Sequence, residues 1–331
     1  MPDQLTPERL GAQLAPGAPA PGGAAAGPRT RPRRRSLGHR LTPYLLLALP
    51  VLLVCLALGY PVVRQVVMSF QEFGLAQQFG RPPEFVGLQN YAEVLSDGYF
   101  WVVVARSIAF CAVCAAVTMA FGVGFAVLMQ QVSRVPRVLL QCALVLAWAM
   151  PPIAALTVYT WLVEPRYGFV NWLLSTVGLP FQGYAWLAAS QWTFFLVAAV
   201  TVIWTSVPLV TLSVYAALTQ VDESIVEAAE IDGAGGAQRL RHVVLPIVRP
   251  VVLLLLMLQV IWDMKVFTQI KVLQAAAGNN ERTNLLGTYV YETGIGGGDY
   301  GMASALATVM LVLVLVMTWR YLRTLMKQGD L

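Results

Sequence analysis

One polar segment, EAAEIDGAGGAQRLRHVVLP from Glu227 to Pro246, holds the most chemically distinctive residues of this chain, and long apolar stretches lie on both sides of it. Ser224 and Glu227 have the S-x-x-E spacing of a capping box, which predicts that a short helix begins there. Gly233 should end that helix with a positive φ, because glycine has no Cβ to clash in that conformation. A second short, basic segment follows from Gln238, so we expect a helical hairpin on the membrane surface.

The rest of the chain shows no pattern that could support catalysis or hold a metal ion. Its two histidines lie far apart, and no group of His, Cys or carboxylate residues has the spacing of metal ligands. A GxxxxGK phosphate-binding loop followed by Ser or Thr is also missing, so ATP, if it is used, must bind to another chain. The four cysteines fall in apolar stretches, where we expect them to fill space: Cys55, Cys111, Cys114 and Cys142.

The composition is that of a membrane protein, with 57% hydrophobic and 12% charged residues and a mean hydropathy of +0.65. A helix needs about 20 apolar residues to cross the hydrocarbon core, so the long uncharged stretches predict an all-α, polytopic fold with six transmembrane helices. The uncharged tract from Tyr167 to Val221 is too long for one helix, and its first part, Gly168 to Leu179, should lie along the interface. The predicted spans are about 41–63, 107–131, 138–163, 191–217, 251–273 and 300–319.

Residues 1–40 form a separate region that is rich in Ala, Pro and Gly and ends in the basic run from Arg29 to Arg40. They show no apolar periodicity and should be disordered. The apolar stretch from Leu41 to Val63 is too long for the core of a signal peptide, so we interpret it as a retained first span. The transmembrane domain is therefore expected over residues 41–328.

The positions of the basic residues predict the orientation of the spans. Basic loops stay on the cytoplasmic side, so both termini and the connection 218–250 should be cytoplasmic. The net charge of +5 is then a signal of topology, and the chain lacks the soluble basic domain that nucleic-acid binding would need. Fifteen of the 22 Lys and Arg residues lie on the predicted cytoplasmic side: Arg9, Arg29, Arg31, Arg33, Arg34, Arg35, Arg40, Arg134, Arg137, Arg239, Arg241, Arg249, Arg320, Arg323 and Lys327.

The polar segment resembles the EAA loop of binding-protein-dependent ABC permeases. In that family a Glu-Ala-Ala triplet precedes a fixed glycine, and a Leu-Pro pair follows. The resemblance implies that this loop is a coupling helix, which sits on a separate ATPase subunit and transmits its closure to the membrane helices. The alternative is an interfacial hairpin that only anchors its neighbours. The matching positions are Glu227, Ala228, Ala229, Asp232, Gly233, Ala234, Leu245 and Pro246.

Three further segments resemble carbohydrate permeases of the maltose-transporter type, and the resemblance covers roughly residues 41–328. It implies the type I ABC importer permease fold and a carbohydrate substrate, expected to be a di- or oligosaccharide. The sequence departs from the family pattern at Val221-Asp222, where Ile-Pro is usual, and around Ala275 to Gly278, where Gly-Gly-Pro is usual. The matching segments are FVGLQNY from Phe85 to Tyr91, Tyr167-Gly168 with Asn171, and Trp204 with Pro208.

The predicted fifth span contains Asp263 and Lys265, which it must include to be long enough to cross. Ionisable groups at membrane depth are costly and usually face a cavity or a partner. Two residues apart on a helix, these two lie on different faces and cannot simply pair. With Gln259, Trp262 and Phe267 they offer polar and aromatic surfaces for sugar, so all five are candidates for the substrate path. The alternative is a salt bridge that Asp263 or Lys265 makes between helices or subunits.

The resemblance also implies partners and a location. A second, similar permease chain, two ATPase subunits that carry ATP and Mg, and an external solute-binding protein or lipoprotein would complete the importer in the bacterial plasma membrane, with the lipid bilayer around it. The chain itself would hold no cofactor and would not be an enzyme. Two other classes of membrane protein fit the sequence less well. An ion-coupled secondary transporter would explain buried charges but not the EAA loop, and a membrane enzyme would need a cluster of reactive groups.

Overall fold

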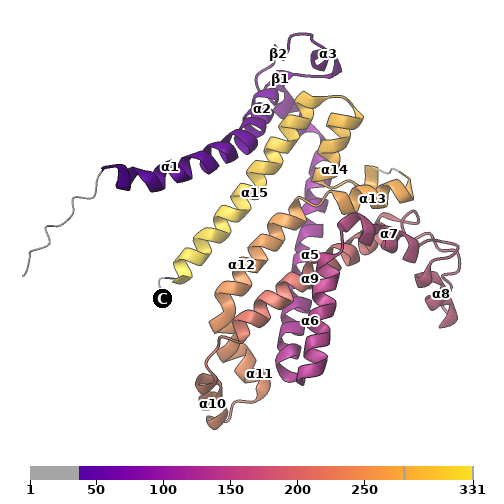
Figure 1. Ribbon diagram of the computed structural model, residues 1–331. Coiled ribbons are helices and arrows are strands. Elements are labelled where there is room, and N and C mark those ends of the chain that lie inside the picture. The colour runs from indigo at the N-terminus through magenta and orange to yellow at the C-terminus, as the bar shows by residue number, and fades with distance from the viewer. Residues whose placement is uncertain (1–36, 279–280, 330–331) are drawn as a thin grey trace, which may run out of the picture. The chain divides into compact units, whose positions relative to one another are not determined.

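The structure is a computed structural model that describes residues 37–278 and 281–329, most of them in helices (Figure 1). The predicted disordered tail lies outside the described residues, except that α1 already begins at Leu37. The chain divides into two compact units, Met1–Ala57 and Leu58–Leu331. In the described part of the first unit, α1 (Leu37–Val54) leads into the π-helical turn η1 (Cys55–Gly59).

The second unit contains nearly all of the secondary structure. Its small β-hairpin pairs Gln71 with Phe85 and Glu72 with Glu84 in antiparallel register. The elements in order are α2 (Tyr60–Met68), β1 (Gln71–Glu72), α3 (Leu75–Gln78), β2 (Glu84–Phe85), α4 (Gln89–Ser96), α5 (Gly98–Gln131), α6 (Arg134–Ala149), α7 (Pro152–Leu162), α8 (Phe169–Thr176), α9 (Gln191–Leu218), α10 (Glu223–Ile231), α11 (Gly236–Arg239), η2 (Leu240–Val244), α12 (Leu245–Met264), α13 (Thr268–Ala277), η3 (Glu281–Thr283), α14 (Leu286–Tyr291), η4 (Glu292–Gly296) and α15 (Tyr300–Gly329).

The predicted all-α membrane fold is confirmed. Within the described residues, five helices are long and apolar enough to cross a membrane, and there are six if the bent pair α6 and α7 counts as one span. The helix α9 starts where the fourth span was predicted, because the Ser190 side chain accepts a hydrogen bond from the Thr193 amide and caps it. The helix α5 starts at Gly98, before its apolar stretch, because Asp97 caps it.

The third span, predicted as one helix over about 138–163, is bent by 100° between α6 and α7. The bend falls at Met150 and Pro151, directly before Pro152. A residue before proline is driven out of the helical conformation, and proline has no amide to continue the helical hydrogen bonds. The hydropathy of a segment carries no information on the direction of its helix axis, so the apolar stretch alone does not predict this bend.

The fifth span, predicted as continuous over about 251–273, is also interrupted. The helix α12 ends at Met264, and α13 begins at Thr268 after a short non-helical stretch. Figure 1 shows the chain changing direction between these two helices. At its N-terminal end the fifth span begins earlier than the predicted residue 251. Helical structure is continuous from Gly236 through α11, η2 and α12.

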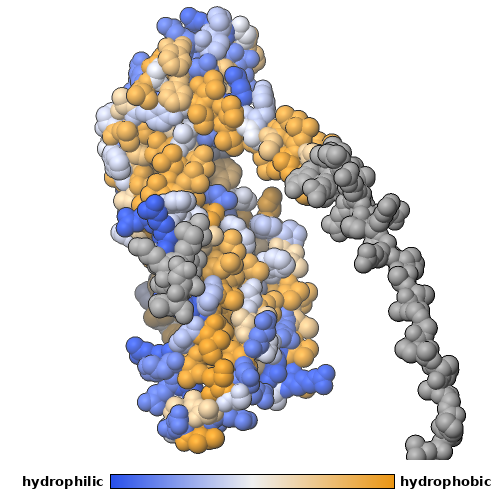
Figure 2. Space-filling view, turned by 90° about the vertical axis from the view of Figure 1, so that its left-hand side faces the viewer, coloured by the Kyte–Doolittle hydropathy of each residue, from blue (hydrophilic) through white to orange (hydrophobic). Residues whose placement is uncertain are grey.

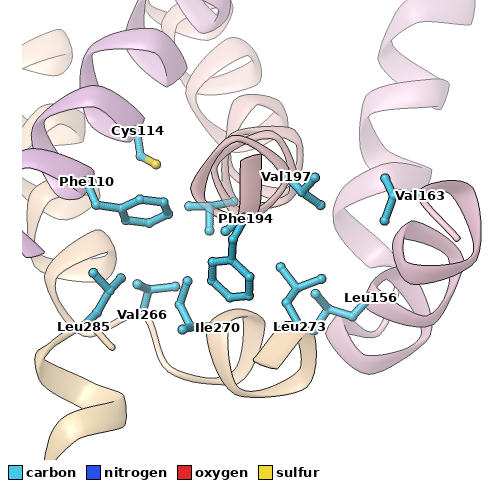
Figure 3. Packing of buried hydrophobic residues seen from close by; sticks show 12 residues of the cluster. Phe110, Cys114, Leu156, Val163, Phe194, Val197, Val266, Ile270, Leu273 and Leu285 are labelled. Atoms are coloured by element: carbon cyan, nitrogen blue, oxygen red, sulfur yellow. The ribbon is translucent and has the colours of Figure 1, made fainter. Parts of the chain in front are cut away.

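The core of the second unit is built on two long apolar helices that pack together, α5 and α9. In one cluster Phe110 and Cys114 of α5 meet Phe194 and Val197 of α9, and side chains from α7 and α13 close over them (Figure 3). A second cluster joins Met119 and other residues of α5 to α9 and α12 nearer the polar hairpin. The two helices therefore fix the positions of the bent third span and the interrupted fifth span.

Large hydrophobic side chains remain exposed on the outer faces of these helices, as a lipid-facing surface requires. Leu146 of α6 is 71% exposed and Trp192 of α9 is 76% exposed. Figure 2 shows broad hydrophobic areas on one face of the molecule, with hydrophilic areas more frequent toward its upper and lower ends. In water such a surface would favour aggregation, whereas in a bilayer it contacts acyl chains.

The close approach of α5 to α9 depends on Gly122, and this predicts an asymmetry between two neighbouring glycines. A Cβ at Gly122 would overlap the side chain of Val210, whereas a Cβ at Gly124 would meet nothing within 4 Å. Gly122→Ala should therefore lower the free energy of unfolding by about 1 to 3 kcal/mol, the usual cost of overpacking. Gly124→Ala should be neutral or raise it by up to about 1 kcal/mol, because alanine favours a helix.

Both variants are to be compared with wild type by titrating SDS into mixed micelles of the purified protein. A Gly122→Ala protein as stable as the Gly124→Ala protein would contradict this account of the α5–α9 contact.

Candidate functional site

The polar hairpin begins with a different cap from the one predicted. Asp222 is the N-cap of α10, and its Oδ1 accepts a hydrogen bond of 2.9 Å from the Ser224 amide. This hydrogen bond holds the pKa of the Asp222 carboxyl below its ordinary value. The predicted capping box of Ser224 and Glu227 is therefore wrong, since Ser224 is already inside the helix. The sequence offers two candidate caps two residues apart, and the carboxylate forms the cap.

The end of α10 agrees with the prediction for Gly233, whose φ is +80°. The Gly233 amide donates to the Glu230 carbonyl and the Ala234 amide donates to the Ala229 carbonyl, both at 3.0 Å. This pair of hydrogen bonds is a Schellman motif, in which the residue after the C-cap adopts the left-handed conformation. Asp232 is the C-cap itself. The turn therefore needs glycine at 233 for its backbone conformation.

An ion pair that the sequence did not suggest joins the two arms of the hairpin. Arg239 Nη1 lies 2.9 Å from Glu230 Oε2, which connects the start of the second arm to the end of α10. In addition, the Gln238 side chain accepts a hydrogen bond from the Gly235 amide and caps α11. Opposite charges nine residues apart carry no recognisable spacing, so only the turn geometry reveals this pair.

The second arm runs directly into the fifth span. The π-helical turn η2 lies immediately before Leu245 and Pro246, and α12 begins with these two residues. A π-turn inserts one extra residue into a helix, which allows the chain to continue through a proline that cannot donate a hydrogen bond. The hairpin is thus covalently continuous, in helical form, with the helix that carries Asp263.

One side of the hairpin is packed and the other is free in this chain. Val226 and Leu240 pack against the cluster formed by α5, α9 and the start of α12. On the opposite side the three EAA residues Glu227, Ala228 and Ala229 present a mostly exposed surface, and Ile231 is 87% exposed. Ile225 of the same helix is also exposed, at 46%. A helical surface of small residues with exposed apolar side chains is suited to contact with another protein.

Four of the five candidate substrate-path residues line a pocket of about 420 Å³. Trp262, Asp263, Lys265 and Phe267 all line it, together with Thr205 and Ser206 of α9 and residues of the bent third span. The two interruptions of helix, at Met150 to Pro152 and at Lys265 to Phe267, both border this pocket. Non-helical backbone at membrane depth is tolerated where it lines a cavity, so the interruptions and the pocket have one physical explanation.

Gln259 does not line the pocket but contacts a residue that does. Its Nε2 donates to Asp263 Oδ1 at 2.8 Å, and both side chains are buried. Asp263 Oδ2 has no hydrogen-bond partner among the described residues and is covered in this conformation. Lys265, the C-cap of α12, is exposed and forms no ion pair with Asp263. Asp263 makes no salt bridge within the described part of the chain.

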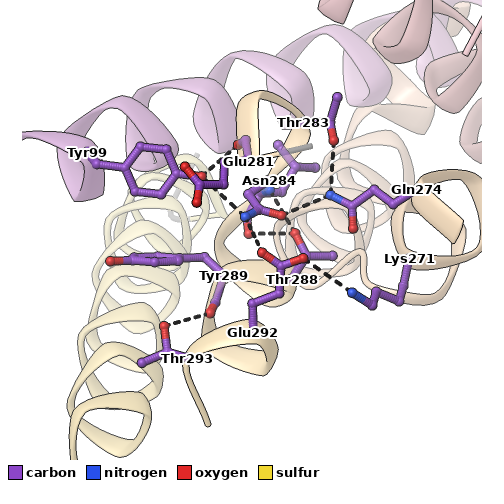
Figure 4. A network of polar contacts seen from close by, with 11 residues as sticks. Tyr99, Lys271, Gln274, Glu281, Thr283, Asn284, Thr288, Tyr289, Glu292 and Thr293 are labelled. Atoms are coloured by element: carbon purple, nitrogen blue, oxygen red, sulfur yellow. Dashed lines mark hydrogen bonds and ion pairs between the residues drawn. The ribbon is translucent and has the colours of Figure 1, made fainter. Parts of the chain in front are cut away.

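A polar network that the sequence reasoning missed connects α5, α13 and α14 at the end of the molecule away from the hairpin (Figure 4). Asn284 Nδ2 donates to Glu292 Oε2 at 2.6 Å, and Lys271 Nζ lies 3.2 Å from Glu292 Oε1. Nearby, Tyr289 donates to Asp97, and burial with this neighbouring carboxylate raises the pKa of Tyr289 to about 12. These residues are dispersed over nearly 200 positions, so no local pattern could have predicted their contact.

The other family-like segments have structural roles. Asn90 is buried, and its Nδ2 donates to the carbonyls of Ser69 and Gln71. Asn171 is likewise buried and bonds the carbonyls of Pro165 and Tyr184. Both asparagines therefore fix loops between helices.

The helical fold, the exposed EAA hairpin and the pocket beside the interrupted fifth span define a membrane permease of the binding-protein-dependent type. Residues 122–323 match the family described as "Binding-protein-dependent transport system inner membrane component". This chain belongs to that family. The prediction of an ABC importer permease is thereby confirmed, and the comparisons support it rather than the ion-coupled secondary transporter.

Several relatives align along most of the chain. The diacetylchitobiose uptake system permease protein DasB of Streptomyces coelicolor is 40% identical over 312 residues, covering 94% of each chain. The sulfoquinovosyl glycerol transport system permease protein SmoG of Agrobacterium fabrum is 31% identical and covers 87% of this chain and 91% of its own. The trehalose/maltose transport system permease protein MalF of Thermococcus litoralis is 32% identical over 72% of this chain and 79% of its own.

A solved structure shows the same fold. A chain of the bacterial alginate ABC transporter, in complex with an alginate pentasaccharide-bound periplasmic protein, superposes with a TM-score of 0.74. It is 20% identical and covers 87% of this chain and 96% of that chain. The likeness establishes the architecture of a multi-pass membrane permease.

The Gln259–Asp263 contact predicts a measurable coupling between these residues. Gln259→Leu leaves the buried carboxylate without its hydrogen bond, which should lower the free energy of unfolding by about 2 to 3 kcal/mol. Gln269→Leu is the matched control, because Gln269 borders the same pocket and its side chain makes no hydrogen bond among the described residues. Adding Asp263→Leu to Gln259→Leu should restore much of the loss, since no carboxylate is then stranded.

Unfolding by SDS titration of the purified variants measures all three values. Equal effects of Gln259→Leu and Gln269→Leu, or a double variant no better than the single one, would contradict the assigned interaction.

Proposed function

We propose that this chain is the permease subunit of an ABC importer that carries a carbohydrate, expected to be a di- or oligosaccharide. The observation that carries the substrate class is the similarity, at 31 to 40% identity, to permeases whose names specify diacetylchitobiose, sulfoquinovosyl glycerol and trehalose or maltose. The absence of a phosphate-binding loop from the sequence is consistent with ATP and Mg being bound on a separate ATPase chain.

The sugar path in this proposal is the pocket beside the interrupted fifth span. Trp262 and Phe267 supply aromatic faces for the apolar sides of sugar rings, while Lys265 and the hydroxyls of Thr205 and Ser206 supply hydrogen bonds. Asp263 Oδ2 is covered here, so a sugar hydroxyl reaches it only when the pocket opens. Because Asp263 Oδ2 has no hydrogen-bond donor among the described residues, a sugar hydroxyl that donates to it would stabilise the open pocket.

The coupling step in this proposal uses the hairpin. Its exposed EAA surface docks on an ATPase subunit, and ATP-driven closure of the ATPase pair moves the hairpin. The helical continuity from Gly236 through Met264 passes that motion to the residues around the pocket. Closure opens the pocket to the outside, where an external solute-binding protein or lipoprotein delivers sugar, and hydrolysis reverses the motion.

The proposed assembly and orientation complete this scheme. A second permease chain pairs with this one as a heterodimer, two ATPase subunits bind below, and the termini and the hairpin face the bacterial cytoplasm. The basic residues of the hairpin support this orientation through the positive-inside rule, and Arg241 and Arg249 are both exposed.

The coupling role predicts that Gly233→Val abolishes the stimulation of ATP hydrolysis by the transported sugar. At φ +80° a residue with a Cβ is strained by roughly 1 kcal/mol or more, so the hairpin should lose its shape while the membrane core folds. We expect a disaccharide from a panel, presented with the binding protein, to stimulate ATPase activity of the wild-type complex in nanodiscs and to drive uptake into proteoliposomes. Gly233→Val should abolish both.

Gly236→Val is the control, because Gly236 begins α11 without a positive φ and a Cβ there meets nothing within 4 Å. It should keep stimulation near wild type. Normal stimulation of Gly233→Val would remove the coupling role, whereas stimulation by glycerol phosphate or an amino acid, with none by any sugar, would refute the carbohydrate assignment.

The orientation predicts a difference in chemical labelling between two exposed positions. Single cysteines at Ala237 in the hairpin and at Gln78 near α3, in a background without the native cysteines, are treated in intact cells with a membrane-impermeant maleimide. The Gln78 position should label and the Ala237 position should not, until the cells are lysed. Labelling of Ala237 from outside intact cells would reverse the proposed orientation and the coupling role with it.

A further inference from the structure

A groove between α5 and α9 lies near the ends of these helices that are far from the hairpin. It has a volume of about 540 Å³ and is lined mainly by apolar side chains, including Val102, Ala109 and Val113 of α5 and Trp192 and Leu196 of α9. It plays no part in the proposed sugar path, which lies beside α12 and α13. Its width and apolar lining suit a hydrocarbon chain.

A more polar pocket of about 480 Å³ adjoins the groove, and Gln191 lines both. Ser190, the N-cap of α9, and Arg282 also border this second pocket. The start of a long helix carries partial positive charge, which favours an anion. Together the groove and the pocket form one amphipathic site, apolar along the helices and positive at their end.

Arg106 lines the apolar groove, and its hydrogen bonds reach the segment 281–284, whose Arg282 and Thr283 border the polar pocket. Its Nη1 donates to the carbonyls of Asn284 at 2.9 Å and Glu281 at 3.3 Å, and its guanidinium lies 5.9 Å from the centre of the Phe195 ring. Both hydrogen bonds are donated by Nη1 to neutral backbone carbonyls, so neither bond neutralises the positive charge of Arg106. In the described part of the chain Arg106 has no carboxylate partner, although a guanidinium has five N–H donors.

We propose that this site binds an anionic phospholipid, with an acyl chain in the groove and the headgroup phosphate on Arg106. A cation in a membrane helix is costly unless an anion or a cavity accommodates it, and a phosphate forms strong, charge-assisted hydrogen bonds with a guanidinium. A helix of a partner subunit would fill the groove but would leave the charge of Arg106 uncompensated, so a lipid is the better occupant.

Trp192 makes the site observable, because it lines the groove and is 76% exposed. The assembled importer is placed in phosphatidylcholine nanodiscs that contain increasing fractions of phosphatidylglycerol or phosphatidylcholine with brominated acyl chains, which quench nearby tryptophans. The chain has nine tryptophans, so the signal of Trp192 is the difference between each protein and its Trp192→Phe counterpart. Half-quenching should need about fivefold less brominated phosphatidylglycerol than brominated phosphatidylcholine, the preference expected from one arginine near an anionic headgroup.

Arg106→Gln should abolish this preference, whereas Arg106→Lys should keep part of it because the charge remains. Arg166→Gln, which removes an exposed arginine remote from the groove, should leave the preference unchanged. Ala109→Leu fills the groove without touching Arg106 and should weaken quenching by both lipids. Ala116→Leu is its control, because Ala116 is exposed on α5 and lies outside the groove.

Equal quenching of the wild type by the two lipids would overturn the proposal. So would an unchanged preference in Arg106→Gln or an Ala109→Leu protein that behaves like Ala116→Leu. If neither lipid quenches Trp192 in the assembled importer, a protein segment fills the groove. That result would also overturn the proposal. If Arg106→Gln does not assemble, Arg106→Lys and Ala109→Leu still decide the outcome.

Discussion

The packing of α5 against α9 is the contact on which the rest of this permease depends. Glycine at 122 allows the two helices to approach until the side chain of Val210 occupies the space of a missing Cβ. Their shared clusters extend from Phe110 and Phe194 at one end to Ala126 and Val214 near the hairpin. In lipid, apolar surface gains nothing by facing another helix, so close van der Waals packing between small residues must hold such a pair together. The pair thereby forms the fixed part of the second unit.

Against this pair, the third and fifth spans are each broken, and both breaks border one pocket. Free backbone amides and carbonyls are intolerable in contact with lipid, so their position is strong physical evidence for a cavity that can contain water. The same reasoning explains why Asp263 is tolerated. Its carboxylate faces Gln259 and the border of the pocket instead of the hydrocarbon. The interruptions, the buried carboxylate and the pocket are three signs of a single feature.

The sequence predicted those features that depend on local chemistry. The bounds of α9 follow from the division of a long uncharged tract, and the positive φ of Gly233 follows from its place after a short helix. The capping residue was misassigned, because Asp222 and Ser224 are both good caps and only the backbone geometry separates them. The bend at Pro151 and the break after Met264 were missed, because hydropathy reports burial in lipid and not direction. The network around Asn284 could not be foreseen, since its residues meet only after folding.

The unbroken helix from Gly236 to Met264 has a mechanical consequence. At about 1.5 Å per residue it is a rod of roughly 43 Å, so a tilt of about 5° at the hairpin displaces its far end by about 4 Å. The rod ends at Lys265, where the backbone leaves the helix, so α13 need not follow the swing. In the proposed coupling, this break would be the joint of a lever. A displacement of a few ångströms is comparable to the width of one sugar hydroxyl with its hydrogen bond, which is the scale on which a passage for a hydrophilic solute opens or closes.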